Sequence, residues 1–371
     1  MNYLSEVTKI IDYGMNSNLN KLFSQVNLLI ETLRKDGDSF SADALEQTLK
    51  ITKKSIKHQS NINTFERPIP VEKDSRFPLA DREIYNKNEI WIELPTGTKE
   101  ILERFITYYE NRDKLIEKNI PVNSSILLYG PPGTGKTKTA SYIASMLGLP
   151  LITARTDALI SSYLGATSKN IRMLMDYAQS TPCVLFLDEF DALAKVRDDS
   201  NEIGELKRVV VTLLQNIDSL KNVVLIAATN HEKLLDKAVW RRFHYKIEIS
   251  LPNETIRENI IKQLLKENID KKIMDILVEL TDGMSGADIE SVCYEYLKEK
   301  AIEKKVSITK LVLFLLMENI PELKLENLVK KDTILLIKSK YNLSYEKIAI
   351  ILDISKAYVA KIIKGSINAK Q

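Results

Sequence analysis

The stretch that decides the fold runs from Gly130 to Thr137 and reads GPPGTGKT. It fits the pattern G-x-x-x-x-G-K-[ST], in which glycines let backbone N–H groups curl around phosphate oxygens. The apolar run at 125–129 before it predicts a strand, and the pattern at 139–147 after it predicts a helix. A helix N-terminus at the end of such a loop adds positive potential. The sequence therefore predicts a phosphate-binding loop here rather than a chance glycine-rich turn.

The polar side chains of this loop have separate expected roles. Lys136 reaches the β- and γ-phosphates of a nucleotide, and the Thr137 hydroxyl is a ligand for Mg²⁺. The expected cofactors are ATP and Mg²⁺. The expected nucleotide-binding residues of this segment are Gly130, Pro131, Pro132, Gly133, Thr134, Gly135, Lys136, Thr137 and Lys138.

A second element, VLFLDE at 184–189, places two carboxylates directly after an apolar strand. Ligands of α/β sheets bind at the carboxyl ends of the strands. We expect Asp188 to bind nucleotide-associated Mg²⁺, mainly through water, and Glu189 to activate the attacking water. An acidic turn after a buried strand is the alternative, and the upstream phosphate-binding loop makes it the weaker one.

Further strand-like runs occur at 151–154, 183–187, 223–228 and 246–251, with helical patterns between them. Strands that alternate with helices indicate a mainly parallel sheet covered on both faces, so the expected fold class is α/β. After Pro252 the chain has helical patterns to its end.

Composition indicates a globular protein of several units. The 371 residues are 44% hydrophobic and 28% charged, and the net charge is only +3, which gives no global reason to expect nucleic acid or membrane binding. Cys183 and Cys293 lie far apart in apolar patterns, so we expect buried thiols and no zinc ribbon or disulfide framework. No signal peptide is visible, and the apolar run Leu311–Met317 is too short to cross a bilayer. The expected location is cytoplasmic.

GPPGTGKT followed by LFLDEFD resembles the AAA family of hexameric P-loop ATPases. VVLIAATN at 223–230 resembles the family's sensor-1 strand, which implies that Asn230 orients the lytic water. AVWRRF at 238–243 resembles its arginine-finger segment, which implies that Arg241 or Arg242 enters the nucleotide site of a neighbouring subunit. The sequence does not decide between these two, and a pair of surface arginines is the alternative. The resemblance implies an ATP-dependent homo-oligomer, a hexamer.

DGMSGADI at 282–289 resembles the lid signature of AAA subgroups that have Ser-Gly-Ala in place of a sensor-2 arginine. This implies that Gly286 and Ala287 pack near adenine and ribose, and that no arginine of this motif touches the γ-phosphate. The expected organisation is a helical N-terminal domain at 1–57, a linker or adaptor at 58–97, the α/β ATPase core at 98–251, a helical lid at 252–320 and a C-terminal module at 326–371.

SSYLGA at 161–166 aligns with the family's first pore loop, so Tyr163, Leu164 and Gly165 are the expected pore residues. An aromatic ring packs on any side chain, and Tyr163 would grip an extended polypeptide. Ser162 stands where the family has a basic residue, and a tyrosine that packs its loop onto the sheet is the alternative.

Residues 345–364 resemble a helix-turn-helix unit, with Asp353 in place of the usual turn glycine. Residues 326–371 carry nine lysines against four acidic residues. The expected DNA contacts are Ser355, Lys356, Ala357 and Lys361. A helical protein-interaction module is the alternative.

Three functions are compatible with this sequence. The first is a motor that remodels a protein substrate, the second a DNA-associated ATPase or regulator, and the third a nucleotide-gated switch for a partner effector. For the third, the N-terminal pattern around Ile10-Ile11 and 33–38 is similar to that of bacterial AAA proteins encoded beside a subtilisin-like protease. No membrane partner is expected.

Overall fold

The computed structural model describes residues 10, 19–39, 41–49, 68–73, 75–160, 164–194, 203–220, 223–303, 306–319 and 331–368. The chain divides into two units, Met1–Pro68 and Ile69–Gln371. In the first unit, helix α2 (Leu19–Lys35) shares a small apolar core with a helical segment at 41–49. Gly37 turns the chain between them with a φ of 86°, a left-handed conformation that glycine adopts at no steric cost.

The second unit contains a six-stranded sheet with the order β1-β3-β4-β5-β2-β6. Strand β1 is antiparallel to β3, and every other pairing is parallel. The strands are β1 (Ala80–Glu83), β2 (Ser125–Tyr129), β3 (Leu151–Ala154), β4 (Val184–Leu187), β5 (Val224–Thr229) and β6 (Tyr245–Glu248). The prediction of an α/β fold with a mainly parallel sheet is confirmed.

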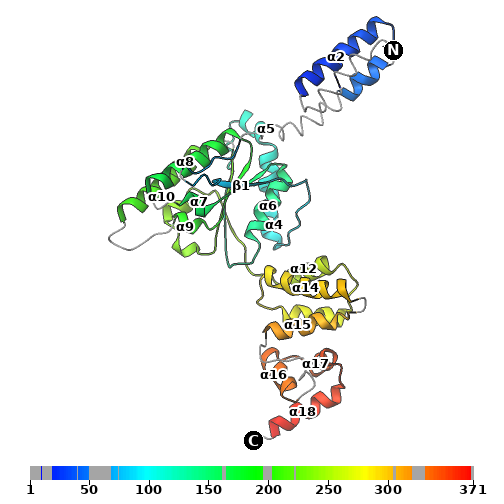
Figure 1. Cartoon of the computed structure of the whole chain (residues 1–371). Helices are drawn as coiled ribbons and strands as arrows, with labels where there is room; N and C mark the ends of the chain where they lie inside the picture. Colours follow the sequence, from blue (N-terminus) through cyan, green and yellow to red (C-terminus); the bar gives the residue numbers. More distant parts are fainter. Residues whose placement is uncertain are drawn as a thin grey trace. The chain divides into compact units, whose positions relative to one another are not determined.

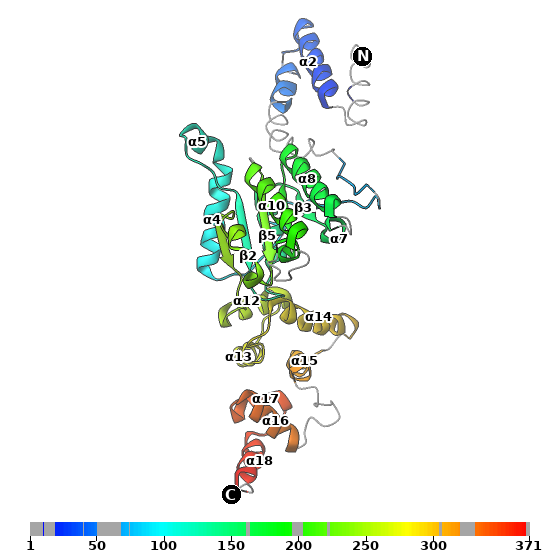
Figure 2. The same cartoon turned by 90° about the vertical axis from the view of Figure 1, so that its left-hand side faces the viewer.

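Both faces of this sheet are buried, because alternate residues of each central strand point to opposite sides. Ile126 and Leu128 face α4 (Thr96–Glu110) and α6 (Lys136–Leu147), whereas Leu127 faces the side of α8 (Leu164–Ser180) and α10 (Ile203–Ser219). Figure 2 shows α4 on one side of the sheet and α8 and α10 on the other. The shorter elements are α5 (Arg112–Glu117), α7 (Thr156–Leu159), α9 (Phe190–Ala194), η1 (Glu232–Leu234) and α11 (Lys237–Trp240).

The chain is helical after the sheet. The helices in the range predicted to be the lid, and called the lid below, are α12 (Glu254–Leu265), α13 (Lys271–Leu280), α14 (Gly286–Ile302) and α15 (Thr309–Asn319). The helices α16 (Lys331–Tyr341), α17 (Tyr345–Leu352) and α18 (Lys356–Asn368) follow. Side-chain caps begin four of them, from Asn253, Asp270, Ser285 and Ser344, which satisfy N–H groups that have no partner inside the helix. Among the described residues, no helix combines the length and the apolar character needed to cross a membrane.

The last three helices share one apolar core with the lid. Helix α15 is the common element, because it packs against α13 and α14 and also against α17. Its residues Leu311, Val312, Leu315 and Leu316 are all buried, which fits a helix with neighbours on two sides. Figure 1 shows α15 between α14 and the group of α16, α17 and α18. The run that is too short for a bilayer is therefore an interior helix.

Two features of the second unit bear on the sequence predictions. Strand β1 and the segment Trp91–Leu94 fall inside 58–97, the range expected to be a linker or adaptor, yet β1 belongs to the sheet and this segment packs beside it. Asp353 was expected to stand in for the usual turn glycine, and it ends α17 in the left-handed conformation with a φ of 49°. The two cysteines are buried and unpaired, as predicted.

Candidate nucleotide site

The phosphate-binding loop starts where β2 ends and is shaped by glycines. A Cβ atom on Gly130 would lie 2.3 Å from the Ile249 carbonyl oxygen, so no other residue fits there unless the backbone shifts. Gly133 and Gly135 have φ values of 72° and 98°, which favour glycine. Gly135 caps α6, so the loop leads directly into a helix N-terminus whose N–H groups suit an anion.

Lys136 lies under this loop and is 6% exposed. Its Nζ donates to the carbonyls of Gly130 at 2.9 Å and Pro131 at 2.6 Å. Burial lowers the pKa of the Lys136 ammonium from its usual value, and the negative charge of Asp188 partly opposes that change. Phosphate oxygens would be stronger partners for this ammonium than two carbonyls, because they carry formal negative charge and a carbonyl offers only a dipole.

Thr137 and Asp188 come together although they are far apart in the chain. The Thr137 hydroxyl donates to Oδ2 of Asp188 at 2.9 Å, and the Glu189 N–H donates to Oδ1 at 2.9 Å. Glu189 has a φ of 49°, so the backbone bends sharply after Asp188. A hydroxyl and a carboxylate are the oxygen ligands that Mg²⁺ prefers, so this pair fits the predicted metal.

A cavity of about 370 Å³ joins these groups to the lid. Asn230, which follows β5, and both carboxylates of 188–189 lie on its wall together with the phosphate-binding loop, so the cavity brings together predicted site residues of three separate segments. The lining residues are Trp91, Ile92, Glu93, Leu94, Pro132, Gly133, Thr134, Gly135, Lys136, Thr137, Lys138, Thr139, Asp188, Glu189, Asn230, Ile260, Gly286, Ala287 and Glu290.

The lid contacts the loop by close backbone approach. The Ala287 N–H donates to the Gly133 carbonyl at 3.0 Å, and a Cβ atom on Gly133 would lie 2.4 Å from the Ser285 hydroxyl. Ser285 and Asp288 form a reciprocal capping box that fixes the start of α14 at this point. Lys138 of α6 also pairs with Glu290 of α14 at 2.5 Å. Gly286 and Ala287 thus lie against the cavity, and no arginine is among the lining residues that the structure describes.

The two candidate arginines, Arg241 and Arg242, have different surroundings. Arg242 donates to Asp218 at 3.1 Å and to the Ala238 carbonyl at 3.2 Å, within its own subunit. Arg241 is exposed, and its guanidinium has no hydrogen-bond or ion-pair partner within the part of the chain that the structure describes. Neither arginine lines the cavity of its own subunit. The described contacts thus hold Arg242 within its own subunit, whereas Arg241 is exposed.

Aromatic contacts anchor this segment on both sides. The ring of Trp240 meets Tyr129, the residue before Gly130, edge to face at 5.2 Å. Phe243 meets Phe190, the residue after Glu189, in the same manner at 5.6 Å. The segment that carries the two arginines is therefore packed against the residues next to the phosphate-binding loop and next to Glu189.

The pore and DNA predictions fall on other parts of the chain. Tyr163 lies outside the described residues, and Leu164 and Gly165 are the first residues of α8. Ser355, Lys356, Ala357 and Lys361 are exposed at the start of α18. Lys356 lies in an ion pair with Glu346 at 3.6 Å, and the same carboxylate accepts a hydrogen bond from Lys272 of the lid at 2.9 Å.

Several cavity residues had no sequence signal. Trp91–Leu94 form one wall, and Glu290 reaches it from the lid, but neither belongs to a motif. The Pro-rich context of 58–97 pointed to a connection instead. A partial signal existed for Trp91, because it is one of only two tryptophans and lies in the alternation Ile90-Trp91-Ile92-Glu93-Leu94 before a proline.

The comparisons with known proteins agree with this geometry. The model of the ATPase family associated with various cellular activities (AAA) matches residues 126–251. An uncharacterized AAA family ATPase of Sinorhizobium fredii is 40% identical over 228 residues, which are 60% of this chain and 68% of that protein.

Two further relatives match over similar lengths. The proteasome-activating nucleotidase of Methanothermobacter thermautotrophicus is 33% identical over 244 residues, 61% of this chain and 58% of that protein. A putative cell division cycle ATPase of Plasmodium falciparum is 35% identical over 241 residues, 62% of this chain and 20% of that protein. This chain matches the AAA family model and the Sinorhizobium protein, and its own nucleotide site has the geometry described above. The chain is therefore a member of the AAA family of ATPases and hydrolyses ATP.

Proposed function

We propose that this AAA ATPase works as an oligomeric ring that uses ATP hydrolysis to remodel a protein substrate. The observation that carries the proposal is the exposed Arg241, whose neighbours Trp240 and Phe243 pack on residues that flank the nucleotide site, while the described lining of that site includes no arginine. The 33% identity to a proteasome-activating nucleotidase supports a protein as the substrate. A hexamer is the assembly that this proposal assumes.

The chemical roles follow from the positions of the side chains. Lys136 and the loop N–H groups would bind the phosphates, and Thr137 and Asp188 would hold Mg²⁺, which would supply Lewis-acid polarisation of the phosphate oxygens. Glu189 takes the proton of the attacking water as general base. Asn230, on the wall of the same cavity, orients that water through its side-chain amide.

Arg241 is the residue that we assign to the neighbour's site. An arginine that meets the transferring phosphoryl group stabilises its charge and is worth ~10³-fold or more in rate. Arg242 cannot leave Asp218 without losing a multidentate ion pair, so its role is to hold the segment from which Arg241 projects.

Mixing two inactive variants tests this assembly. Arg241→Ala keeps an intact phosphate-binding loop and lacks the arginine, whereas Lys136→Ala has the reverse defect. In a randomly mixed ring at equal amounts, about a quarter of the sites combine an intact loop with an intact neighbouring arginine, so turnover should return. The measurement is steady-state ATPase activity of each variant and of the mixture.

Arg242→Ala is the matched comparison. It should lower thermal stability through the lost Asp218 pair, and Arg241→Ala should not, because its guanidinium is exposed. Turnover that is independent of protein concentration in a strict monomer, or no recovery on mixing, contradicts the ring.

Substrate remodelling needs its own test. Tyr163→Ala should retain basal ATPase activity and lose any stimulation by a permanently unfolded protein, because an aromatic side chain at the pore would contact the polypeptide. Equal stimulation of wild type and variant removes Tyr163 from substrate contact. Failure of stimulation in wild type would count against a protein substrate while leaving the ATPase assignment intact.

A second candidate function is DNA association through the C-terminal module. The observation in its favour is the helix–turn–helix order of α17, Asp353 and α18, with Lys361, Lys364 and Tyr358 exposed on α18. Lysine attracts phosphates and few side chains here could read bases, so binding should be electrostatic, weakly selective and strongly salt-dependent. Six modules in a ring would add avidity.

A titration of labelled duplex DNA by fluorescence anisotropy, at low salt with ATP, tests this candidate. Lys356→Glu with Lys361→Glu should abolish binding, and Lys298→Glu on the lid is the charge control. Absence of binding at micromolar wild-type protein moves the module to the protein-interaction alternative. The effector switch with a protease partner stays a prediction from the sequence.

A further inference from the structure

A buried hydroxyl lies immediately before Asn230. Thr229, the last residue of β5, is 1% exposed. Its hydroxyl donates to Oδ1 of Asp191 at 2.6 Å and accepts from the His231 N–H at 2.9 Å. His231 follows Asn230 directly, and Asp191 comes two residues after Glu189. One hydroxyl therefore connects the turn that carries Asn230 to the start of α9, which follows Glu189.

This connection lies where the backbone ladder ends. Strands β4 and β5 pair in parallel up to Leu187 and Ala227, and their paired register stops there. Glu189 and Asn230 both lie beyond that point, so no strand-to-strand backbone pairing fixes the distance between them. The bond from Thr229 to Asp191 is a side-chain hydrogen bond that joins the two strand ends past the ladder.

We propose that Thr229 and Asp191 are positioning residues, which hold Asn230 in register with Glu189 across the nucleotide cavity. Neither of them lines the cavity, whereas Asn230 and Glu189 both do. They act on the reaction through those two side chains. The proposal rests on the catalytic roles proposed above for Asn230 and Glu189.

The chemistry of the bond suits this role. A hydroxyl that donates to a carboxylate makes a charge-assisted hydrogen bond, which is short and directional. Because the same hydroxyl accepts from the His231 N–H, its position sets the turn on the other side of Asn230 as well. Removal of the hydroxyl takes the acceptor away from the part-buried His231 N–H, which favours a rearrangement of the turn.

The expected kinetic effect falls on kcat rather than on KM. ATP is bound by the loop and by Lys136, which the change does not touch, whereas the water is aligned by Asn230 and Glu189. A displacement of about 1 Å in aligning groups costs up to ~10²-fold in rate. Thr229→Val should therefore lower kcat by ~10- to 10²-fold with little change in the KM for ATP.

Two variants separate positioning from simple loss of stability. Thr229→Ser keeps the hydroxyl and should retain most of the turnover. Thr281→Val is the matched control, since the Thr281 hydroxyl is fully buried and hydrogen-bonded to Leu277 and Val278 in the lid. It should lower the melting temperature to a similar extent and leave kcat unchanged.

A double-mutant cycle with Asn230→Ala decides the mechanism. If Thr229 acts through Asn230, Thr229→Val in the Asn230→Ala background should cause little further loss, since residues that act as a unit are not additive. Full additivity, wild-type kcat for Thr229→Val, or a rise in KM that accounts for its defect overturns the positioning role. Wild-type turnover by Asn230→Ala alone refutes the proposed role of Asn230, and the positioning role falls with it. Absence of ATP turnover in the wild-type protein would instead contradict the ATPase assignment.

Discussion

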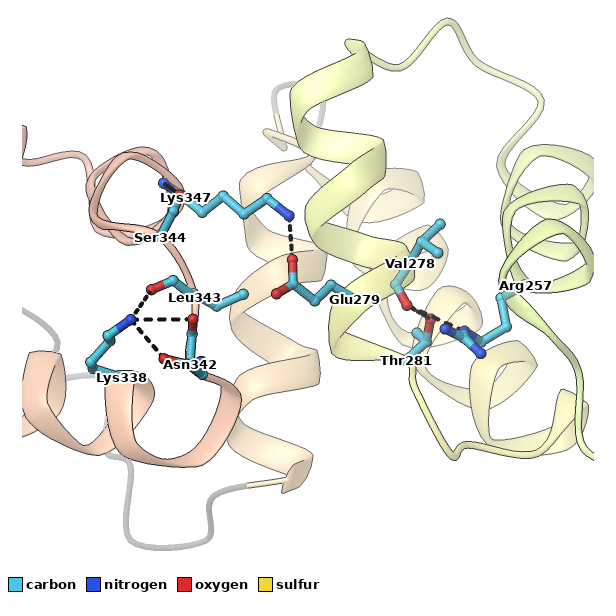
Figure 3. A network of polar contacts seen from close by, with 9 residues as sticks. All are labelled: Arg257, Val278, Glu279, Thr281, Lys338, Asn342, Leu343, Ser344 and Lys347. Carbon is cyan, nitrogen blue, oxygen red and sulfur yellow. Dashed lines mark hydrogen bonds and ion pairs between the residues drawn. The ribbon is translucent and has the colours of Figure 1, made fainter.

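The two ends of the lid are held by different kinds of interaction. At the nucleotide end, α14 meets the phosphate-binding loop through a backbone hydrogen bond of 3.0 Å and a glycine that leaves no space for a Cβ atom. At the other end, α15 joins the lid to α16–α18 through a continuous apolar core. Ion pairs at the edge of this core, such as that of Lys347 with Glu279, connect α17 to α13 (Figure 3).

The difference predicts different sensitivity to change. A backbone contact over one or two residues depends on sub-ångström geometry and fails with a single added methyl group. An apolar core depends on total buried area and tolerates loss at its edge. We therefore expect substitutions at the nucleotide end to change turnover and substitutions at the module end to change stability.

The largest effect should come from Gly133→Ala. The new Cβ would lie 2.4 Å from the Ser285 hydroxyl, and the φ of 72° disfavours any side chain. The lid would be pushed off the loop, and turnover should fall by ~10²-fold or more.

Gly148→Ala is the matched control for that substitution. Gly148 also has a positive φ, of 62°, but a Cβ atom there would meet nothing within 4 Å. It should lower stability by about 1 kcal/mol and leave turnover unchanged. Equal loss of ATPase activity in both variants would show that the backbone conformation of glycine, rather than the lid contact, is what matters.

An intermediate effect is expected inside α15. Leu316 is fully buried between the lid and the module, so Leu316→Ala should lower the free energy of unfolding by ~2–5 kcal/mol. Leu313 is only partly buried on the same helix, and Leu313→Ala should cost clearly less. Urea denaturation followed by circular dichroism measures both. Equal shifts for the two leucines would contradict a helix packed between two neighbours.

The smallest effect should come from the ion pair of Lys347 and Glu279. Both side chains are about one-third exposed, so water and salt screen their attraction. A double-mutant cycle of Lys347→Ala and Glu279→Ala should give a coupling of ~0.2–1 kcal/mol and unchanged turnover. A coupling several times larger would mean that the edge of this interface contributes as much as its apolar core.

Sequence alone predicted the parts of this site that are local. The glycine pattern at 130–137 and the apolar strand before Asp188 carry their own signals, and the strands expected from them are present. The contact of Thr229 with Asp191 joins residues 38 positions apart, and its members look like ordinary neighbours of motif residues. Trp91 lies at the cavity through tertiary contacts, against the lid core and under the Lys138 ammonium. Such contacts depend on tertiary packing, which no local pattern encodes.

The contacts between the lid and the C-terminal module also depend on tertiary packing. The run Leu311–Met317 is visibly apolar all round, but its length excluded only a membrane span and did not indicate which helices would cover it. In the structure, two of its sides are buried, by the lid and by α17. The basic character of 326–371 was equally visible, yet the engagement of Lys356 by Glu346 depends on how α17 and α18 pack.

The central claim is that Glu189 activates water in a site whose loop and lysine bind ATP independently of it. Glu189→Gln keeps the size of the side chain and removes its basicity, so ATP should bind with near wild-type affinity while turnover falls by ~10²- to 10⁴-fold. The measurement is equilibrium binding of ATP together with steady-state phosphate release, with Lys136→Ala as the variant that loses binding. Turnover of the Glu189→Gln protein near the wild-type rate, with binding intact, would contradict the account.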